Sequence, residues 1–407
     1  MLSWCNRFNI CSFLDNHHYQ LPGHSYECLA GCGVTASVTA NAGNALEVLQ
    51  AFLDEQNDWC FGHLGYDLKN ETEQLSSAHE NKIGFPDLCF FVPQYVFQLS
   101  ETGLRIGSLQ NDHATVYAAI CKEPTTVDTK QNSIQFNEHV SKANYISSIN
   151  RIREHILRGD CYELNYCMEF FAEAAIDPLH VYKSLTEISP NPFSAFYKVE
   201  SSYLLCASPE RFLRKQGTQL LSQPIKGTVK RNNNDAIADE GLKQQLHNSE
   251  KDRSENVMVV DLVRNDLSRV CNEGTVKVDE LFAVYSFPQV HQMISSVTGE
   301  VNEAYSFTDI IKATFPMGSM TGAPKRRVMQ LIDQYEQSRR GIFSGAVGYI
   351  APNGDFDFNV VIRSILYNEA AQYLSYMVGS GITFYSDAEN EYEECLLKAD
   401  AIRKVLG

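Results

Sequence analysis

The chain has 407 residues, of which 44% are hydrophobic and 21% charged, and its formal net charge at pH 7 is −16. This composition is typical of a globular protein with one large domain or two closely packed halves. The negative charge argues against nucleic-acid binding, which needs a basic surface, and no tract of eighteen apolar residues indicates a membrane span.

The N-terminal sequence lacks the basic and apolar segments of a secretory signal, so we expect a cytoplasmic protein. The twelve cysteines include no CxxC pair, which argues against a zinc or dithiol site. Free thiols in a reducing compartment are the expected state.

Taken in chain order, residues 1–121 mix short apolar runs such as Leu88–Val92 with turn clusters, a pattern that predicts strands with a few helices. The segment Trp59–Asp67 is typical of a strand that enters a glycine-rich turn. A polar stretch at Lys122–Ser133 then marks an expected boundary between an N-terminal α+β region, residues 1–133, and a second region, residues 134–407.

Beyond this boundary, Ala143–Leu157 carries apolar residues at helical spacing and predicts a helix that ends at Gly159. The runs Ala195–Val199 and Tyr203–Ala207 flank a short polar turn, which predicts two antiparallel strands. Strands mixed with long helices favour an α+β fold over a strict βαβ repeat.

Lys226 follows the strand-like run Leu220–Gln223 on what the sequence predicts to be a glycine-bounded turn. A lysine there becomes a nucleophile only if burial or a neighbouring cation lowers its pKa. The alternative is an ordinary surface lysine in a β-turn. Glu210, sixteen positions earlier, could reach the same pocket as an acid or form an ion pair with Arg211.

Two predicted helices, Gln244–Met258 and Glu389–Val405, each carry carboxylates three residues apart on one face. Such helices could clamp one hard cation through oxygen ligands, with magnesium as the natural candidate. Taken singly, each acidic face is also typical of a solvated helix surface.

Two further polar residues lie in apolar, strand-like runs. Arg363 would need an anion there, which an internal salt bridge or a ligand could supply. His291 alternates with apolar residues, and taken alone it is typical of a hydrogen-bonded core histidine.

Four segments together carry a resemblance to a known family: Ser208–Leu213, Glu255–Leu267, Gly318–Lys325 and Glu391–Ala399. They resemble the chorismate-utilising enzymes, which include the large subunits of anthranilate, isochorismate and aminodeoxychorismate synthases. The resemblance runs through the C-terminal two thirds and implies an α+β fold in which large antiparallel sheets pack as a sandwich with helices outside. It also implies that residues 134–407 form a chorismate-binding catalytic domain.

The resemblance assigns roles to residues that match the family's motifs. The implied catalytic residues are Lys226, Glu210 and His291. The implied magnesium ligands are Glu255 and Glu394, with Glu391 and Asp252 as supporting candidates. The implied substrate contacts are Gly227, Thr228, Ser319, Tyr349, Arg363, Gly379, Gly381 and Lys398.

Within this family the residue at Lys226 separates the reactions, since many aminodeoxychorismate synthases carry lysine where the other two enzymes typically carry alanine. The resemblance implies that the Lys226 amine adds to C2 of chorismate while the C4 hydroxyl leaves with help from Glu210. Ammonia then adds at C4 to give 4-amino-4-deoxychorismate, a precursor of p-aminobenzoate and folate. Isochorismate synthases typically place a lysine in the segment that matches Tyr162–Cys167, and none is present.

Anthranilate synthase stays the close alternative, and a non-catalytic sensor of chorismate or of an aromatic amino acid is an alternative of a different class. No Gly-x-Cys-x-Gly loop with a downstream His-x-Glu indicates a glutaminase site. We therefore expect a separate glutamine amidotransferase subunit to supply ammonia.

Overall fold

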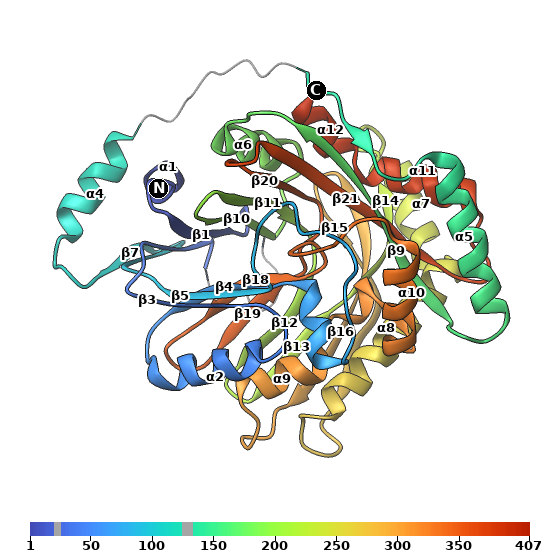
Figure 1. Cartoon of the computed structure of the whole chain (residues 1–407), viewed down its shortest axis with the longest axis horizontal. Helices are drawn as coiled ribbons and strands as arrows, with labels where there is room; N and C mark the ends of the chain where they lie inside the picture. Colours follow the sequence, from blue (N-terminus) through green and yellow to red (C-terminus); the bar gives the residue numbers. More distant parts are fainter. Residues whose placement is uncertain (20–25, 124–132) are drawn as a thin grey trace.

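The computed structural model describes residues 1–19, 26–123 and 133–407. Two large antiparallel sheets pack as a sandwich with helices on the outside, which is the predicted α+β architecture (Figure 1). We call them sheet A and sheet B, and their strands follow in spatial order. Sheet A contains β17 (Gly322–Ala323), β9 (Glu163–Glu173), β21 (Tyr373–Ile382), β20 (Ser364–Asn368), β11 (Ser202–Ser208), β10 (Phe193–Val199), β1 (Ile10–Asp15), β2 (Cys28–Cys32), β6 (Tyr95–Ser100) and β7 (Gly103–Ser108), with β8 (Asn137–Glu138) beside β9. Sheet B contains β14 (Ile225–Lys230), β16 (Val290–Glu300), β13 (Gln219–Gln223), β12 (Arg211–Gln216), β19 (Phe356–Asn359), β18 (Ala346–Ile350), β4 (Cys60–Leu64), β5 (Leu88–Val92) and β3 (Ala36–Ala40), with β15 (Lys277–Ser286) beside β16.

Both sheets contain strands from each side of the expected boundary at residue 133. In sheet A, β1 pairs with β10 so that Ile10 lies opposite Val199. In sheet B, β4 pairs with β18 so that Leu64 lies opposite Ala346. The division into two regions stays a prediction, and residues 124–132 of the polar stretch lie outside the described residues.

Helices cover the outer faces of the sandwich (Figure 1). Outside sheet A lie α5, α6, α10 and α11, whereas α2, α8 and α9 lie outside sheet B. The helices are α1 (Leu2–Cys5), α2 (Ala45–Glu55), α3 (Lys69–Thr72), α4 (His113–Lys122), α5 (Lys142–Leu157), α6 (Pro178–Ile188), α7 (Ala236–His247), α8 (Glu250–Ser268), α9 (Phe307–Thr314), α10 (Lys325–Tyr335), α11 (Ala388–Lys398) and α12 (Asp400–Leu406), with short 3-10 turns η1 (Tyr66–Leu68) and η2 (Gly318–Met320).

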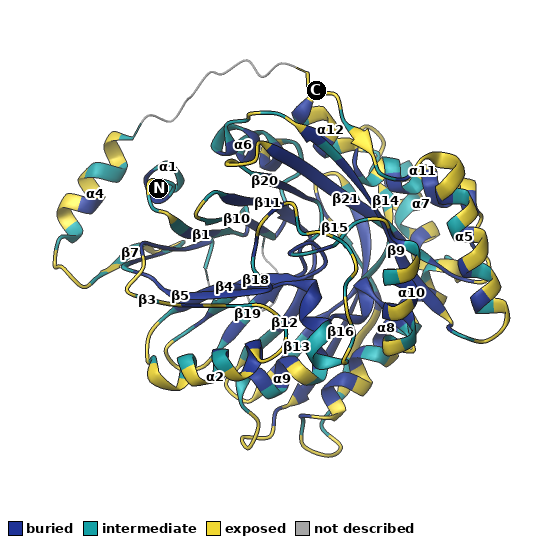
Figure 2. Cartoon of the chain, in the orientation of Figure 1, coloured by how far each residue is buried: buried dark blue, intermediate teal, exposed yellow. Residues whose placement is uncertain are grey.

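The strands carry most of the buried surface, and the helices turn one polar face outward (Figure 2). One apolar cluster, which includes Phe61, Leu204 and Val347, links the two sheets and reaches the helices outside sheet B. A second cluster, which includes Tyr145 and Leu374, lies between sheet A and its helices. In the part of the chain that the structure describes, no helix is long and apolar enough to cross a membrane.

Two of the predicted elements are confirmed by the structure. The helix expected over 143–157 is α5, and its N-cap Ser141 accepts a hydrogen bond from the backbone N–H of Asn144. The strands β10 and β11 are antiparallel, with Phe196 opposite Leu205.

Both predicted acidic helices are interrupted, which the helical spacing alone did not indicate. The first ends as α7 at His247 and restarts as α8, because the Ser249 side chain caps the new helix by accepting from the N–H of Asp252. The second is divided at Ala399 into α11 and α12. The strand-like run around Arg363 is also interrupted, because β19 ends at Asn359 and Arg363 has a φ of +52° before β20 begins.

Candidate functional site

Lys226 lies on strand β14 and not on the predicted turn. The register of β14 against β16 shifts between Ile225 and Thr228, where Gly227 has a φ of +86°. Such an irregularity changes the direction of the side chains next to it. A larger residue than glycine would also clash at position 227, because a Cβ atom there would lie 2.9 Å from Cγ of Asp252 on α8.

The ammonium group of Lys226 donates a hydrogen bond to Oε1 of Glu163 at 2.5 Å. Both side chains are buried, with 11% of Lys226 and 3% of Glu163 exposed. Glu163 belongs to β9 of sheet A and Lys226 to β14 of sheet B, so this ion pair joins the two sheets. Glu163 was not among the predicted site residues, although a carboxylate in the mostly apolar run Tyr162–Met168 is a usable signal.

The surroundings of Lys226 favour its charged form. Burial alone would lower its pKa, but the carboxylates of Glu163 and Glu255 outweigh that effect and raise the pKa above its usual range. A nucleophilic lysine was expected to have a lowered pKa. The structure instead holds this amine as a buried cation.

Gly381 on β21 makes room for this ion pair. A Cβ atom at Gly381 would lie 2.8 Å from Oε1 of Glu163 and 2.9 Å from Nζ of Lys226. The neighbouring Gly379 accepts a hydrogen bond on its carbonyl oxygen from Nζ of Lys398 at 2.9 Å. Both glycines are part of strand β21, and a Cβ atom at Gly379 would clash with Cys167 on the neighbouring strand β9.

The carboxyl group of Glu210 is brought close to Lys226. Burial raises the pKa of Glu210 to about 7, while Ser319 on η2 and the cation of Lys226 partly offset the rise. The backbone N–H of Ile225 also donates to this carboxyl group. The alternative ion pair with Arg211 is not formed, because Arg211 binds the carboxylate of Asp357 at 3.0 and 3.1 Å.

Three glutamates from two helices surround the ammonium group of Lys251. Its Nζ lies 3.3 Å from Glu391, 3.9 Å from Glu394 and 4.0 Å from Glu255. Glu394 also binds Lys398 at 2.8 Å on the same helix. We call Glu255, Glu391 and Glu394 the acidic clamp.

The acidic clamp has unsatisfied oxygens that suit a hard cation. Oε1 of Glu255 and Oε2 of Glu391 are buried and have no hydrogen-bond partner among the described residues. Burial raises the pKa of Glu255 to about 7, with Lys226 partly offsetting it. These donors fit an oxygen-bound divalent cation.

The clamp does not form a complete metal site by itself. Within residues 1–19, 26–123 and 133–407, no group of three or more His, Cys, Asp or Glu side chains is arranged to hold a metal ion. Asp252, the fourth predicted ligand, lies against Gly227 on the Lys226 side of α8. A cation at the clamp would therefore take further ligands from water or substrate.

Arg363 is a further cation near the clamp. Burial lowers the pKa of its guanidinium group, and the charge of Glu394 opposes that shift. No carboxylate of the described residues lies within ion-pair distance of Arg363, so the internal salt bridge that sequence left open is not formed there.

His291, Thr228 and Tyr349 have no described contact with Lys226. Both ring nitrogens of His291 are engaged, with Nε2 3.1 Å from Oδ1 of Asp239 and Nδ1 2.9 Å from Oγ of Ser286. Thr228 is exposed on β14.

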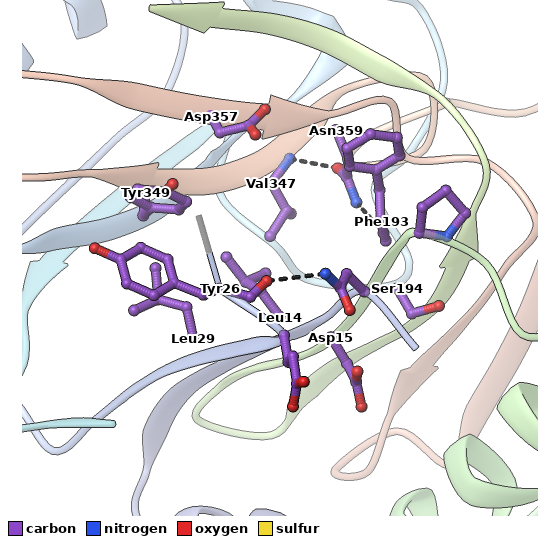
Figure 3. A pocket seen from close by; sticks show the side chains of 13 residues that line it. Leu14, Asp15, Tyr26, Leu29, Phe193, Ser194, Val347, Tyr349, Asp357 and Asn359 are labelled. Atoms are coloured by element: carbon purple, nitrogen blue, oxygen red, sulfur yellow. Dashed lines mark hydrogen bonds between the residues drawn. The ribbon is translucent and has the colours of Figure 1, made fainter. Parts of the chain in front are cut away.

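Tyr349 lines a separate pocket between the sheets, together with Tyr26, Asp15 and Asp357 (Figure 3). Its ring lies 5.7 Å from that of Trp59 and 6.5 Å from that of Tyr26. The structure therefore gathers most of the predicted site residues around Lys226 and the clamp, and leaves these three outside that group.

Comparison with known proteins identifies the family. Residues 18–404 match the family model described as chorismate binding enzyme. The chain is 32% identical to aminodeoxychorismate synthase component 1 of Escherichia coli over 382 residues, which cover 90% of this chain and 84% of the relative. It is 36% identical to the chloroplastic aminodeoxychorismate synthase of Arabidopsis thaliana over 374 residues, or 84% of this chain, and spans only 40% of that relative's length.

Solved structures agree on the fold. Anthranilate synthase component I from Streptococcus pneumoniae superposes with a TM-score of 0.83 at 24% identity, covering 95% of this chain and 93% of the other. The menaquinone-specific isochorismate synthase of Escherichia coli superposes with a TM-score of 0.79 at 18% identity, covering 100% of this chain and 91% of the other. With the family model matching nearly the whole chain, this protein belongs to the family of chorismate binding enzymes.

Proposed function

We propose that this chain aminates chorismate at C4 with ammonia and so produces 4-amino-4-deoxychorismate. The observation that carries the proposal is Lys226, a buried primary amine beside the protonatable carboxyl group of Glu210. The names of the relatives from Escherichia coli and Arabidopsis thaliana support the same activity.

The two groups suit the two halves of the first step. The neutral amine of Lys226 would attack C2 of the ring, and the ring double bonds would shift towards C4. The C4–O bond would break as its oxygen takes a proton from Glu210 and leaves as water. A pKa of about 7 keeps a share of Glu210 protonated near neutral pH, as a general acid requires.

The second step would release the lysine. Ammonia would add at C4, the double bonds would shift back, and the bond from C2 to Nζ of Lys226 would break. The lysine would leave as a neutral amine, and the product would carry its new nitrogen at C4. The pyruvyl group of the substrate takes no part in either step.

We further propose that the acidic clamp holds Mg²⁺ through Glu255, Glu391 and Glu394, with Asp252 nearby. When bound, the metal would supply positive charge for a substrate carboxylate. Arg363 suits a second carboxylate, because a guanidinium group binds carboxylates in a bidentate manner. The long-range repulsion of an anionic substrate by a chain of net charge −16 makes such local cations necessary.

Ammonia would come from a glutamine amidotransferase subunit, in keeping with the designation of the bacterial relatives as component 1. If so, the purified chain turns over chorismate with ammonium but not with glutamine alone. The expected cytoplasmic location stays a prediction, since two plant relatives are named as chloroplastic.

The first test is product analysis of Lys226→Ala beside the unaltered chain, with chorismate, Mg²⁺ and ammonium. We expect the unaltered chain to give an aminated product that keeps its pyruvyl group. The variant should lose this activity by at least about 10³-fold, because it lacks the nucleophile, while its Mg²⁺ binding persists. Lys230→Ala on the exposed end of the same strand is the matched control and should keep full activity.

Two other outcomes would redirect the proposal. Anthranilate as product would show that the amine attacks elsewhere on the ring and that pyruvate is eliminated. Chorismate binding without turnover would favour the non-catalytic sensor.

A further inference from the structure

The contact between Lys226 and Glu163 raises a chemical question. A nucleophilic amine needs a free lone pair, but the surroundings of Lys226 hold it as an ammonium ion. Its proton must therefore move to an acceptor before the amine can attack. The acceptor has to lie within hydrogen-bond distance of Nζ.

The carboxylates around Lys226 are not equivalent as acceptors. Glu210 has to arrive protonated if it is to assist the leaving hydroxyl, so it cannot also take this proton. Glu255 belongs to the acidic clamp, and no hydrogen bond joins it to Lys226 among the described contacts. Glu163 alone of the three accepts a hydrogen bond from Nζ, at 2.5 Å.

The second carboxylate oxygen of Glu163 and the burial of its side chain also suit a proton acceptor. Its Oε2 is buried and has no hydrogen-bond partner among the described residues. The side chain is only 3% exposed, so bulk water does not compete for the proton. Gly381 leaves both side-chain tips in contact, where a methyl group would separate them.

We propose that Glu163 is the catalytic base that takes the proton from Lys226 and so generates the attacking amine. This inference rests on the lysine adduct of the proposed function. The N–H bond of Nζ breaks and an O–H bond forms on Oε1 of Glu163, which turns the ion pair into a neutral pair. The freed lone pair then forms the bond to C2, which leaves Lys226 as a secondary ammonium, and the C4 oxygen departs as water with the proton of Glu210.

The test measures adduct formation in a single turnover, with chorismate and Mg²⁺ but without ammonium, so that the lysine adduct accumulates. Its yield against time is read from the mass of the intact chain, which increases by chorismate less one water. The variant is Glu163→Gln, which keeps the shape and the hydrogen bond but cannot accept a proton. We expect it to form the adduct at least about 10²-fold more slowly at pH 7.

The pH dependence separates a base from a structural group. Without Glu163, solvent has to remove the proton, so the rate ratio between unaltered chain and Glu163→Gln should shrink about tenfold per pH unit as the pH rises. Glu163→Asp keeps the carboxylate and should recover part of the lost rate at pH 7. A purely structural role would give the same loss at every pH and no recovery by aspartate.

Glu169→Gln is the matched control, because Glu169 lies on the same face of β9, is buried and contacts the Tyr373 hydroxyl at 3.2 Å. It should form the adduct at the normal rate. If Glu163→Gln forms the adduct as fast as the unaltered chain across the pH range, the inference is wrong while the proposed function stands. If the unaltered chain forms product but no adduct, the lysine mechanism fails, and the role of Glu163 fails with it.

Discussion

At the scale of single residues, Lys226 and Glu210 are shifted towards their protonated forms for different reasons. Glu210 is protonated more readily because burial disfavours its charge, and its pKa is raised to about 7. Lys226 keeps its proton because neighbouring carboxylates favour the cation. The first shift suits an acid directly, whereas the second obliges a nucleophile to pass its proton to a neighbour.

The buried carboxyl group of Glu210 should be visible in the pH dependence of stability. Its pKa in the folded chain, about 7, exceeds the ordinary value of 4.5. The protonated Glu210 side chain therefore contributes its full stability, relative to Glu210→Gln, below pH 4.5. This contribution to the free energy of unfolding is lost as the pH rises towards 7. The difference in free energy of unfolding should fall by about 3 kcal/mol over this range.

Urea unfolding of both proteins at several pH values from 4 to 8 measures this difference. The glutamine variant is the internal reference, since it removes one titrating group and retains the shape. A difference that is constant with pH would mean that folding leaves the pKa of Glu210 unchanged.

At the scale of elements, the geometry of the site depends on glycine positions in two strands, β14 and β21. The irregularity at Gly227 brings β14 against α8, and Gly381 of β21 leaves room for the ion pair of Lys226 and Glu163. η2, which carries Ser319, is fixed by Arg340, whose guanidinium group donates to the carbonyls of Met320 and Asn165 at 2.7 and 2.8 Å. The chemistry is thus positioned by backbone features in both sheets.

Gly381→Ala tests whether the ion pair of Lys226 and Glu163 needs the room that Gly381 leaves. The backbone at Gly381 is not left-handed, so alanine fits its conformation, but the added methyl group would separate Lys226 from Glu163. We expect kcat/KM to fall by about 10²-fold with little change in Tm, because a displacement of about 1 Å at reacting groups has effects of that size.

Gly241→Ala on α7 is the control for this substitution, since nothing lies within 4 Å of the position of its added Cβ atom. It should leave kcat/KM unchanged and stabilise the helix by about 0.5–1 kcal/mol. Full activity in Gly381→Ala would contradict the assigned role of the ion pair.

Hydrophobic periodicity predicted helices that bury one continuous face. It failed where capping or tertiary contacts determine where a helix begins or ends. The apolar spacing of Ile149 and Ile152 located α5 because that helix buries one continuous face. The division at Ser249 was missed, because capping by a serine competes with helix continuation in a way that hydrophobic spacing does not record.

The site was predicted in part, for a related reason. Motif resemblance named Lys226, Glu210 and the acidic clamp, since these residues lie in distinctive segments. Glu163 and Lys251 gain their roles from partners 63 and 140 residues away, on other elements. Tyr349 was assigned by the same motif resemblance, and in the structure it lines the pocket with Tyr26.

At the scale of the whole molecule, strands from the first 133 residues form one edge of each sheet, where they pair with strands of the second region. β1 and β2 lie between β10 and β6, and β4 lies between β18 and β5. Removal of the N-terminal region would expose the pairing edges of β10 and β18 together with the apolar cluster that includes Phe61. Unpaired edges and exposed apolar surface favour aggregation.

Residues 134–407 expressed alone should therefore fail to give a cooperatively folded protein, as judged by thermal unfolding and size-exclusion chromatography. Co-expression with residues 1–133 should restore a soluble complex, because both sheets can then be completed. A monomeric 134–407 fragment with a sharp unfolding transition would show that the catalytic region folds independently.

The ion pair between the two sheets has a consequence for the core that separates them. Lys226 and Glu163 start from different sheets, so the separation of the sheets sets the distance over which the proposed proton transfer would occur. Side chains such as Leu204 and Val347 belong to the apolar cluster that packs the two sheets together, and close packing holds the sheets at a fixed separation. A proton crosses a short hydrogen bond much faster than a stretched one. The rate at which Lys226 reacts should therefore depend on how closely the interior of the protein is packed.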